Sequence, residues 1–408
     1  MWPRTSIASF LYQPSDGDAE EGAVDGVAAR PAGLDTPRVP AKVKFVGAAH
    51  EAAYPEAFEE GRSAAQEEVL TFQQLEPSRV DWDELDSYAD RNVFQTREWL
   101  SFIEKTQRAE PVIAVIRRGD ETVGFFTGLV IRRYGIRILG SPFRGWTTSY
   151  LGFNLREGVS RRAAVEALLP FAFHSLGCLH LELRDRHLQP GDVEGLGFDY
   201  SPKTIFEVDL RRSEEEIFAG MTSACRRCIR KAEKVGVTVE EANDIGFAID
   251  YYAQLRDVFA KQLLVPTHDS TRVTELIRHL LPTGRLLLLR ARDDEGRCIA
   301  TGVFPAMNGR MYFWGGASLR QYQILRPNEA VMWHAMNYWK VRGAGWCDLA
   351  GGAEYKRKYG PDEVSVPFFR ISRFRAISMA RDVAKRAFKV RQAALGRATS
   401  GRSGTRES

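Results

Sequence analysis

A segment near the end of the chain combines an acid, glycines, cations and tyrosines in the manner of an anion-binding site. Residues 348–352 read DLAGG and residues 355–360 read YKRKYG. Glycines let the backbone approach a ligand closely, and three cations between two tyrosines supply charge, hydrogen-bond donors and aromatic walls. Asp348 is either a general base or an anchor of the turn through backbone N–H groups. The alternative to a functional site is an ordinary loop with structural tyrosines.

A second concentration of positive charge falls on a predicted helix. Ser213 and Glu216 form a capping box, apolar residues recur at three- and four-residue spacing up to Val235, and Gly236 is a natural stop. We therefore expect one helix over residues 213–235. Its cations lie on the flank away from the apolar stripe: Arg226, Arg227, Arg230, Lys231 and Lys234. This density of charge predicts a phosphate or carboxylate partner, and the alternative is a solvated helix face.

Cys225 and Cys228 on the same helix have the spacing of a metal or redox motif. No second cysteine pair and no nearby histidine completes such a site, and both residues fall on the expected buried stripe. We therefore predict packing residues and no metal. His268, which follows Val-Pro-Thr, is either an aid to proton removal or a structural residue.

These clusters are positioned by elements that occur twice, about 170 residues apart. The first copy has strands at 111–117, 122–131, 136–139 and 178–183 and a helix at 159–176. The second has strands at 285–291, 298–305, 311–314 and 345–349 and a helix at 328–341. An antiparallel meander followed by a helix and a further strand, occurring twice, predicts a duplicated α/β domain. We expect a ligand cleft between the two copies.

Composition and charge limit what the rest of the chain can be. The 408 residues are 44% hydrophobic and 27% charged, with five sparsely placed cysteines and no run of eighteen apolar residues. Residues 1–68 are acidic, lack sustained periodicity and are expected to be disordered. Residues 375–408 form a basic tail that suits a membrane surface or RNA, or that does nothing specific. We expect a cytoplasmic protein, and the tail allows peripheral contact with the cytoplasmic face of the inner membrane.

Three segments in order resemble the peptidoglycan-bridge FemAB aminoacyltransferases and their BioF2-like relatives in the GNAT superfamily. They are the cation-rich stretch 226–237, residues 325–328 (LRPN) opening a helix, and residues 348–360. The resemblance covers about residues 80–370 and lacks the long helical-hairpin arm of some members. It implies an α/β (α+β) fold with two GNAT-like domains in tandem, each a mixed, mostly antiparallel sheet flanked by helices. We place these domains at 69–210 and 211–374.

The resemblance also implies the reaction, which is transfer of an acyl or aminoacyl group to an amine, or a sugar hydroxyl, of a cell-envelope or exopolysaccharide precursor. Lys356 matches the family's basic residue after the Gly-rich turn and would neutralise substrate phosphate or a developing oxyanion. Lys356 and Asp348 are thus the expected catalytic residues. The expected substrate-binding residues are Arg226, Arg230, Lys231, Arg326, Asn328, Tyr355 and Lys358.

The acyl donor is left open between acyl-CoA and aminoacyl-tRNA, each a co-substrate, with no permanently bound cofactor. GNAT domains that use acetyl-CoA generally hold its pyrophosphate with a Gly-rich, Arg-containing loop before the main helix. Residues 322–328 offer one arginine there and no glycine. Two other classes remain: a non-catalytic GNAT-like module that binds an anionic glycan or lipid-linked precursor, and a nucleic-acid-binding protein, for which no groove-reading motif is visible.

Overall fold

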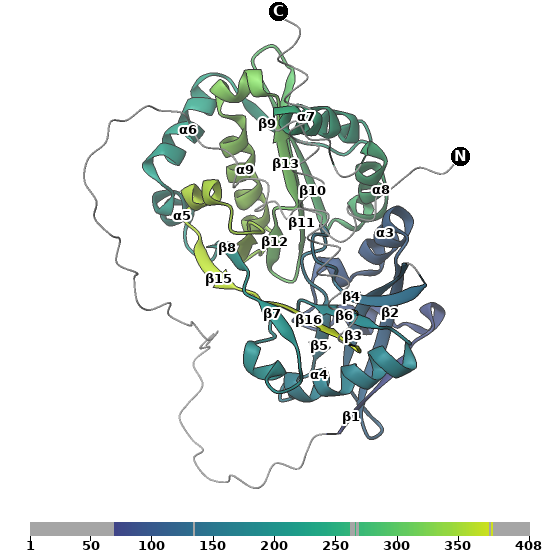
Figure 1. The fold of residues 1–408 in the computed structure, drawn as a ribbon. Helices are drawn as coiled ribbons and strands as arrows, with labels where there is room; N and C mark the ends of the chain where they lie inside the picture. Colours follow the sequence, from purple (N-terminus) through teal and green to yellow (C-terminus); the bar gives the residue numbers. More distant parts are fainter. Residues whose placement is uncertain (1–68, 134, 262–265, 267–268, 375–376, 378–408) are drawn as a thin grey trace, which may run out of the picture.

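The computed structural model describes residues 69–374 and 377, except 134, 262–265 and 267–268. These residues form two eight-stranded sheets flanked by helices, one in each half of the molecule (Figure 1). The α/β fold class is therefore confirmed. The acidic segment 1–68, the basic tail and His268 lie outside the described residues.

The first sheet has the strand order β1-β2-β3-β4-β6-β16-β7, and β5 also pairs with β3. Its strands are β1 (Leu70–Gln74), β2 (Glu110–Arg118), β3 (Glu121–Arg133), β4 (Ile136–Ser141), β5 (Gly152–Leu155), β6 (His180–Leu183), β7 (Asp199–Ser201) and β16 (Phe368–Ser372). The helices of this half are α2 (Trp82–Asp86), α3 (Arg97–Gln107) and α4 (Arg161–Pro170). The last of these continues into the π-helical turn η3 (Phe171–Ser175).

The second sheet repeats this plan in the order β15-β8-β14-β12-β11-β10-β9, with β13 on β11. Its strands are β8 (Thr204–Asp209), β9 (Thr238–Glu241), β10 (Leu286–Arg292), β11 (Cys298–Met307), β12 (Arg310–Tyr312), β13 (Gly315–Ser318), β14 (Trp346–Asp348) and β15 (Asp362–Ser365). The helices are α5 (Glu214–Gly220), α6 (Ser223–Lys234), α7 (Phe247–Lys261), α8 (Ser270–Leu280) and α9 (Pro327–Val341). Short 3₁₀ turns include η6 (Arg320–Leu325) and η7 (Glu354–Tyr359).

The internal repeat predicted from the sequence is present: the predicted strands and the one predicted helix of each copy occur in the same order in both halves. One local prediction was wrong, because the expected helix over 213–235 is two helices. Ser213 and Glu216 do form the capping box of α5, but that helix ends at Gly220. A new helix then starts because the Thr222 side chain accepts a hydrogen bond from the Cys225 backbone N–H. Gly236 has a left-handed φ of +78°, as a helix stop requires.

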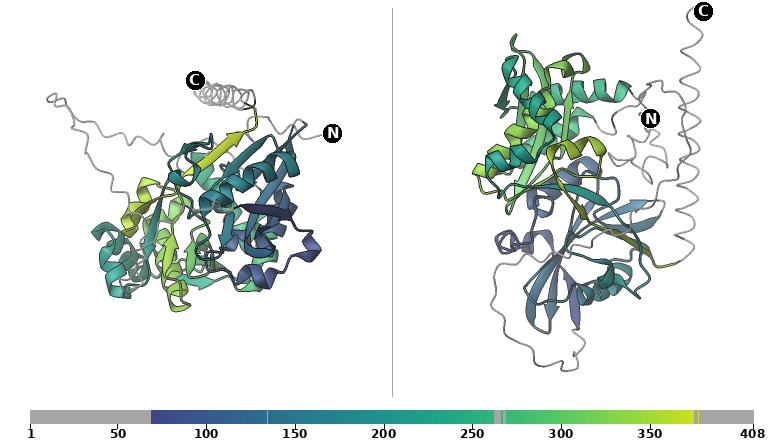
Figure 2. Two further views of the ribbon diagram at one scale, coloured as in Figure 1. Left: turned by 90° about the horizontal axis from the view of Figure 1, so that it is seen from below. Right: turned by 90° about the vertical axis from the view of Figure 1, so that its left-hand side faces the viewer.

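The two halves exchange one strand each. β8, which follows β7 in the chain, joins the second sheet between β14 and β15, whereas β16 returns to the first sheet between β6 and β7. The two crossings run side by side, since the Val366 N–H donates to the Lys203 carbonyl at 2.9 Å. Figure 2 shows the yellow β15–β16 segment passing from one half into the other. The sheets therefore do not divide at residue 210, where the sequence placed the boundary.

Apolar packing also crosses between the halves. One core cluster joins Phe94 and Trp99 of the first half to Leu276 of α8 in the second, all fully buried. The Phe94 ring lies 4.7 Å from that of Tyr312 on β12. Because burial of aromatic side chains dominates core energetics, we expect the two halves to unfold as one unit.

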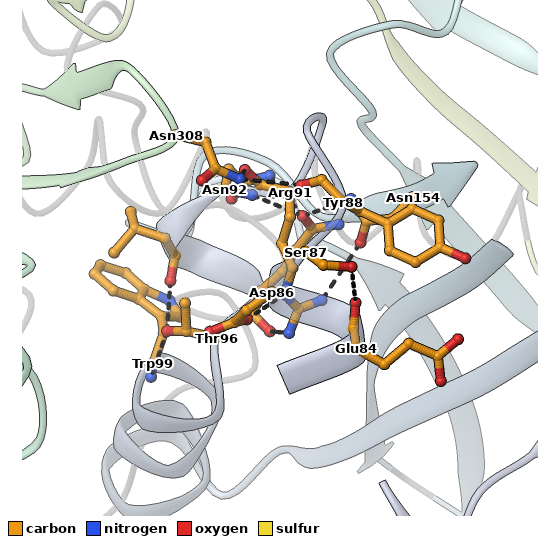
Figure 3. Close-up of polar contacts among 12 residues, drawn as sticks. Glu84, Asp86, Ser87, Tyr88, Arg91, Asn92, Thr96, Trp99, Asn154 and Asn308 are labelled. Atoms are coloured by element: carbon orange, nitrogen blue, oxygen red, sulfur yellow. Dashed lines mark hydrogen bonds and ion pairs between the residues drawn. The ribbon is translucent and has the colours of Figure 1, made fainter. Parts of the chain in front are cut away.

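A network of hydrogen bonds around a buried arginine connects the two halves beside this core (Figure 3). Arg91 is 1% exposed and donates to the Asp86 carboxylate at 2.7 Å and to the Gln95 carbonyl at 2.6 Å. Asn308, in the turn between β11 and β12, donates to the carbonyls of Tyr88 and Arg91 at 3.1 and 2.9 Å. The β11–β12 turn of the second half is thus fixed to the first half by paired polar groups.

Candidate active site

The second sheet opens where β12 and β14 diverge. These two strands pair in parallel up to Tyr312 and Asp348, and the Phe313 N–H still donates to the Asp348 carbonyl at 2.8 Å. Beyond this point β13 stays on β11, while β14 turns away. Val303 and Ala306 are three positions apart on β11. Their partners, Gly315 and Met311, are four positions apart on the opposite strands. This one-residue bulge redirects the strand and separates β13 from β14.

Asp348 supports the turn that follows β14. Its side chain is 1% exposed. One carboxylate oxygen accepts the Ala350 backbone N–H at 2.7 Å, and the other accepts the Tyr150 hydroxyl of the first half at 2.8 Å. Ala350 and Gly351 have φ values of +53° and +40°, a left-handed backbone that the hydrogen bond from Ala350 stabilises. Of the two roles expected from the sequence, this geometry matches the anchor of the turn.

Lys356 lies against this turn. It is 2% exposed, and its Nζ donates to the Ala350 carbonyl at 3.0 Å. The same nitrogen lies 5.7 Å from the centre of the Phe313 ring and 5.5 Å from that of Tyr355. The ammonium group is therefore held at the opening by aromatic walls and a backbone carbonyl. Tyr355 itself is 46% exposed and forms the outer wall.

The loop that carries Lys356 is tied to the start of α9. Lys358 Nζ contacts the Glu329 carboxylate in the first turn of that helix at 2.8 Å. The preceding residue Arg326 has a left-handed φ of +63°, and no side chain caps the helix. Asn328 donates instead to the Ser318 hydroxyl at 3.0 Å. The N-terminal backbone N–H groups of α9 thus lack a side-chain cap on the side of the sheet opening.

The start of α6 lies beside this loop, but in the described residues none of its predicted substrate-binding cations bonds to the loop. The Thr222 N–H at the start of α6 donates to the Lys358 carbonyl at 2.9 Å. Arg226, one turn later, donates to the Ala219 carbonyl at 2.7 Å and to that of Met221, so it bridges α5 and α6. Arg230 lies over the Phe218 ring at 5.2 Å, and Lys231 is exposed. In the described part of the chain neither has a hydrogen bond or ion pair to the turn.

A buried ionic cluster underlies the opening, and sequence reasoning missed all of it. Glu207 on β8 is 3% exposed and pairs with Arg186 and with Arg310 on β12. Arg186 also lies 3.8 Å from Asp348. Arg186 comes from the first half, as does Tyr150, which contacts the same carboxylate. The only signal in the sequence was Glu207 within the apolar strand 205–208, because an acid at such a position requires a buried partner.

The pKa values of Tyr150, Glu207 and Arg186 in this cluster are all raised, by different combinations of burial and charge. Burial, together with the charge of Asp348, raises the pKa of Tyr150 well above its usual value, so this phenol stays protonated and donates. Burial also raises the pKa of Glu207, although Arg310 and Arg186 oppose that effect. The pKa of Arg186 is raised, because Glu207, Tyr150 and Asp348 outweigh the effect of burial. Arg186 therefore stays charged and Tyr150 neutral within the cluster.

The first sheet has a corresponding opening, and it is filled. A ten-residue loop, residues 142–151, joins β4 to β5. Leu129 on β3 pairs with Gly140 on β4, whereas Thr127 on β3 pairs with Gly152 on β5. Because β6 pairs with β4, strands β5 and β6 are separated at this point. Asp185, which follows β6, accepts the Phe153 backbone N–H at 2.8 Å and lies 3.2 Å from Arg161 in the first turn of α4. A Cβ on Gly152 would lie 2.5 Å from the Asp185 carboxylate. Side chains thus fill the space between these strands.

The cysteines form no site among the described residues. Burial raises the pKa of Cys225 to about 12, and Cys228 is partly buried. The Cys225 thiol therefore stays protonated near neutral pH, and its burial fits a packing role. Across the described ranges, no group of three or more His, Cys, Asp or Glu side chains is placed to hold a metal ion. None of the helices in those ranges is both long and apolar enough to cross a membrane.

Comparison with known proteins finds a family match within the second half. Residues 221–357 match the model of the acetyltransferase (GNAT) domain family. The resemblance to GNAT-type acyltransferases is confirmed. Among solved structures, FemX superposes with a TM-score of 0.59 at 12% identity and covers 73% of this chain and 96% of its own. This likeness shows that the fold is shared with FemX over nearly its full length.

Two further solved structures are less similar to this chain. A tandem GNAT protein from the clavulanic acid biosynthesis pathway has a TM-score of 0.48 at 12% identity, covering 74% of this chain and 98% of its own. L-PGS from Bacillus licheniformis has a TM-score of 0.45 at 10% identity, covering 72% and 96%. None of the curated proteins matches the sequence. The GNAT-type domain supports acyl transfer as the class of reaction.

Proposed function

We propose that the protein transfers an acyl or aminoacyl group to an amine or sugar hydroxyl of an anionic cell-envelope precursor, and that the opening of the second sheet is the reaction site. The observation that carries this proposal is Lys356, a cation held by Phe313, Tyr355 and the Ala350 carbonyl at the point where β12 and β14 part. The GNAT match of residues 221–357 supports the reaction class. The acceptor class comes from the sequence resemblance to FemAB-type enzymes.

In this proposal the acceptor nitrogen or oxygen attacks the carbonyl carbon of the donor. A new C–N or C–O bond forms, a tetrahedral oxyanion develops, and the bond to the donor's leaving group then breaks. The proton lost by the acceptor leaves through solvent or the departing group. Lys356 stabilises the oxyanion, and the reaction otherwise needs only correct positioning, so no covalent nucleophile is required. Asp348 and Tyr150 act as positioning residues, because they hold the turn against which Lys356 lies.

The donor would enter along the same opening. The uncapped start of α9, with Arg326 and Asn328, offers backbone N–H groups and one cation to a phosphate or a terminal carboxylate. Glu329 in the same turn is neutralised by Lys358 at 2.8 Å, which reduces its repulsion of an anionic donor. The exposed cations of α6, Arg227, Arg230, Lys231 and Lys234, extend positive charge outward for a larger anionic partner.

Thermal-shift measurements with acetyl-CoA, a long-chain acyl-CoA, tRNA and a nucleotide-linked muropeptide test the proposal. A ligand at about 100 times its Kd adds roughly 2.7 kcal/mol of stability, which raises Tm measurably. We expect one donor and the muropeptide each to raise Tm, and turnover when both are supplied. Stabilisation by an acyl-CoA would exclude the aminoacyl-tRNA version. A shift with the muropeptide alone and no turnover with any donor would indicate a binding module and would contradict the enzyme proposal.

A further inference from the structure

Arg272 is a buried cation that forms no ion pair with a carboxylate among the described residues. It lies in the first turn of α8 and is 8% exposed. Its Nη2 donates to the Thr147 hydroxyl of the first half at 2.9 Å, and its buried Nε has no hydrogen-bond partner in the described part of the chain. Asp269, the N-cap residue of α8, accepts the Arg272 backbone N–H at 3.3 Å, and its charge acts on the guanidinium group without forming an ion pair. The only hydrogen bond of the guanidinium group to a described side chain is thus the one to the neutral Thr147 hydroxyl.

Two other buried arginines of this protein are paired with carboxylates. Arg290 is 7% exposed and pairs with Asp244 at 2.6 Å and Asp250 at 2.8 Å. Arg91 is 1% exposed and pairs with Asp86 at 2.7 Å. A buried charge is costly unless it is paired and hydrogen-bonded. Burial lowers the pKa of Arg272 to about 10, which still leaves it protonated at neutral pH. Because no carboxylate of the described residues forms an ion pair with Arg272, an anion from outside can balance its charge.

The position of Arg272 allows such an anion to reach it. Thr147 is half-buried and lies on the loop 142–151, which closes the first half toward the second. Tyr150, three residues along the same loop, reaches Asp348. Three residues span at most about 10 Å of chain, so Thr147 and the supported turn belong to one neighbourhood. The contact between Arg272 and Thr147 joins the two halves, as expected for a ligand subsite between domains.

We propose that Arg272 and Thr147 form an anion-binding subsite between the two halves that takes a carboxylate or phosphate group of a substrate. A guanidinium group matches both oxyanions through two parallel N–H donors. The Thr147 hydroxyl accepts from Arg272 and can donate its own proton to the ligand. That the anion belongs to a substrate rests on the proposed function, whereas binding of the anion does not.

Calorimetric titration of the full chain with inorganic phosphate and with acetate tests the subsite, with ionic strength held constant by sodium chloride. Arg272→Met keeps the length of the side chain and removes its charge. Arg278→Met on the same helix is the matched control, because Arg278 is exposed and pairs with Glu275 at 2.6 Å. We expect one or both anions to bind wild type and Arg278→Met equally, and to bind Arg272→Met at least about tenfold more weakly. The titration that reaches saturation, with phosphate or with acetate, shows whether the subsite binds a phosphate or a carboxylate group.

The same variant has an expected effect without any ligand. Removing an unpaired buried charge should leave Tm unchanged or raise it. Should Arg272→Met fail to fold, Thr147→Val and Arg272→Lys provide the test, and both should weaken anion binding while the fold is kept. Equal affinity in wild type and the Arg272 and Thr147 variants, an equal loss in Arg278→Met, or no binding beyond that of chloride would overturn the inference. Those results would leave the proposed role of Lys356 untouched.

Discussion

The two halves build the same sheet opening and treat it differently. In the first half, Asp185 spans from the end of β6 to the backbone of β5 and to Arg161 on α4, and a side-chain cap from Ser160 closes the helix. In the second half, the turn 350–352 reads Ala-Gly-Gly and has no side chain larger than a methyl group. The helix there lacks a side-chain cap. The two equivalent places of the repeat thus differ in their side chains: Asp185 spans the first, whereas a turn of small residues with Lys356 against it forms the second, where we propose that the chemistry takes place.

The largest expected effect on stability comes from breaking the filled opening. Asp185→Ala leaves Arg161 with only Asp90 as a partner and leaves the Phe153 N–H unsatisfied. We expect the free energy of unfolding to fall by about 3 kcal/mol. Urea unfolding measures this, and Glu157→Ala, an exposed acid in the same half, should change it by less than about 0.5 kcal/mol. A loss of that small size for Asp185→Ala would show that the first opening is not held by ion pairs.

The next effect concerns the loop that carries Lys356. Gly360 has φ +69°, and a Cβ there would lie 2.3 Å from the Gly220 carbonyl oxygen. Gly343 has φ +89° and open space around it. Both alanine variants carry left-handed strain of about 1 kcal/mol, and Gly360→Ala adds a clash with backbone, so we expect about 2 kcal/mol or more. Chemical unfolding of the two variants compares them. Equal losses would mean that the loop is not packed against the α5–α6 junction.

The prediction of the fold succeeded where periodicity was sufficient. The paired hairpins, the helices before β6 and β14, and the capping box at Ser213 all follow from local patterns of apolar residues and turn residues. The break at Thr222 was missed because the apolar spacing continues across it. The strand exchange and the contacts of Tyr150 and Arg186 with Asp348 join residues more than about 130 positions apart, and no local pattern encodes such pairs. Lys356 could be proposed from sequence, but its aromatic neighbour Phe313 could not.

A smaller effect tests how the first half supports the second. Tyr150→Phe removes the hydroxyl that donates to Asp348 at 2.8 Å and leaves a buried carboxylate oxygen with one fewer partner. We expect a loss of about 1.5 kcal/mol in unfolding free energy. A double-mutant cycle with Asp348→Asn isolates this contact. Tyr200→Phe, at an exposed tyrosine of the first half, is the control. Additive effects of Tyr150→Phe and Asp348→Asn would show that the two residues are not coupled.

The smallest effect concerns pH. Burial lowers the pKa of His334 on α9 below the ordinary value of 6.5. The unfolded chain then takes up a proton near pH 6.5, where the folded protein does not, so this contribution to stability is present above pH 6.5 and lost as pH falls below it. We expect His334→Gln to flatten the fall of Tm between pH 7.5 and about 5.5, whereas His174→Gln, at an exposed histidine of the first half, should not. Identical profiles for both variants would contradict this.

The rate of acyl transfer by Lys356→Met tests the central claim most directly, once thermal shifts have identified the donor. Arg357→Met is the matched control, because Arg357 is the next residue, is exposed and pairs with Glu354 and Glu363 on the surface. Loss of a group that stabilises an oxyanion typically lowers kcat by about 100- to 1000-fold. We predict a loss of that size for Lys356→Met with Tm preserved, and near wild-type kcat for Arg357→Met. Wild-type kcat in Lys356→Met would contradict the account and place the chemistry elsewhere.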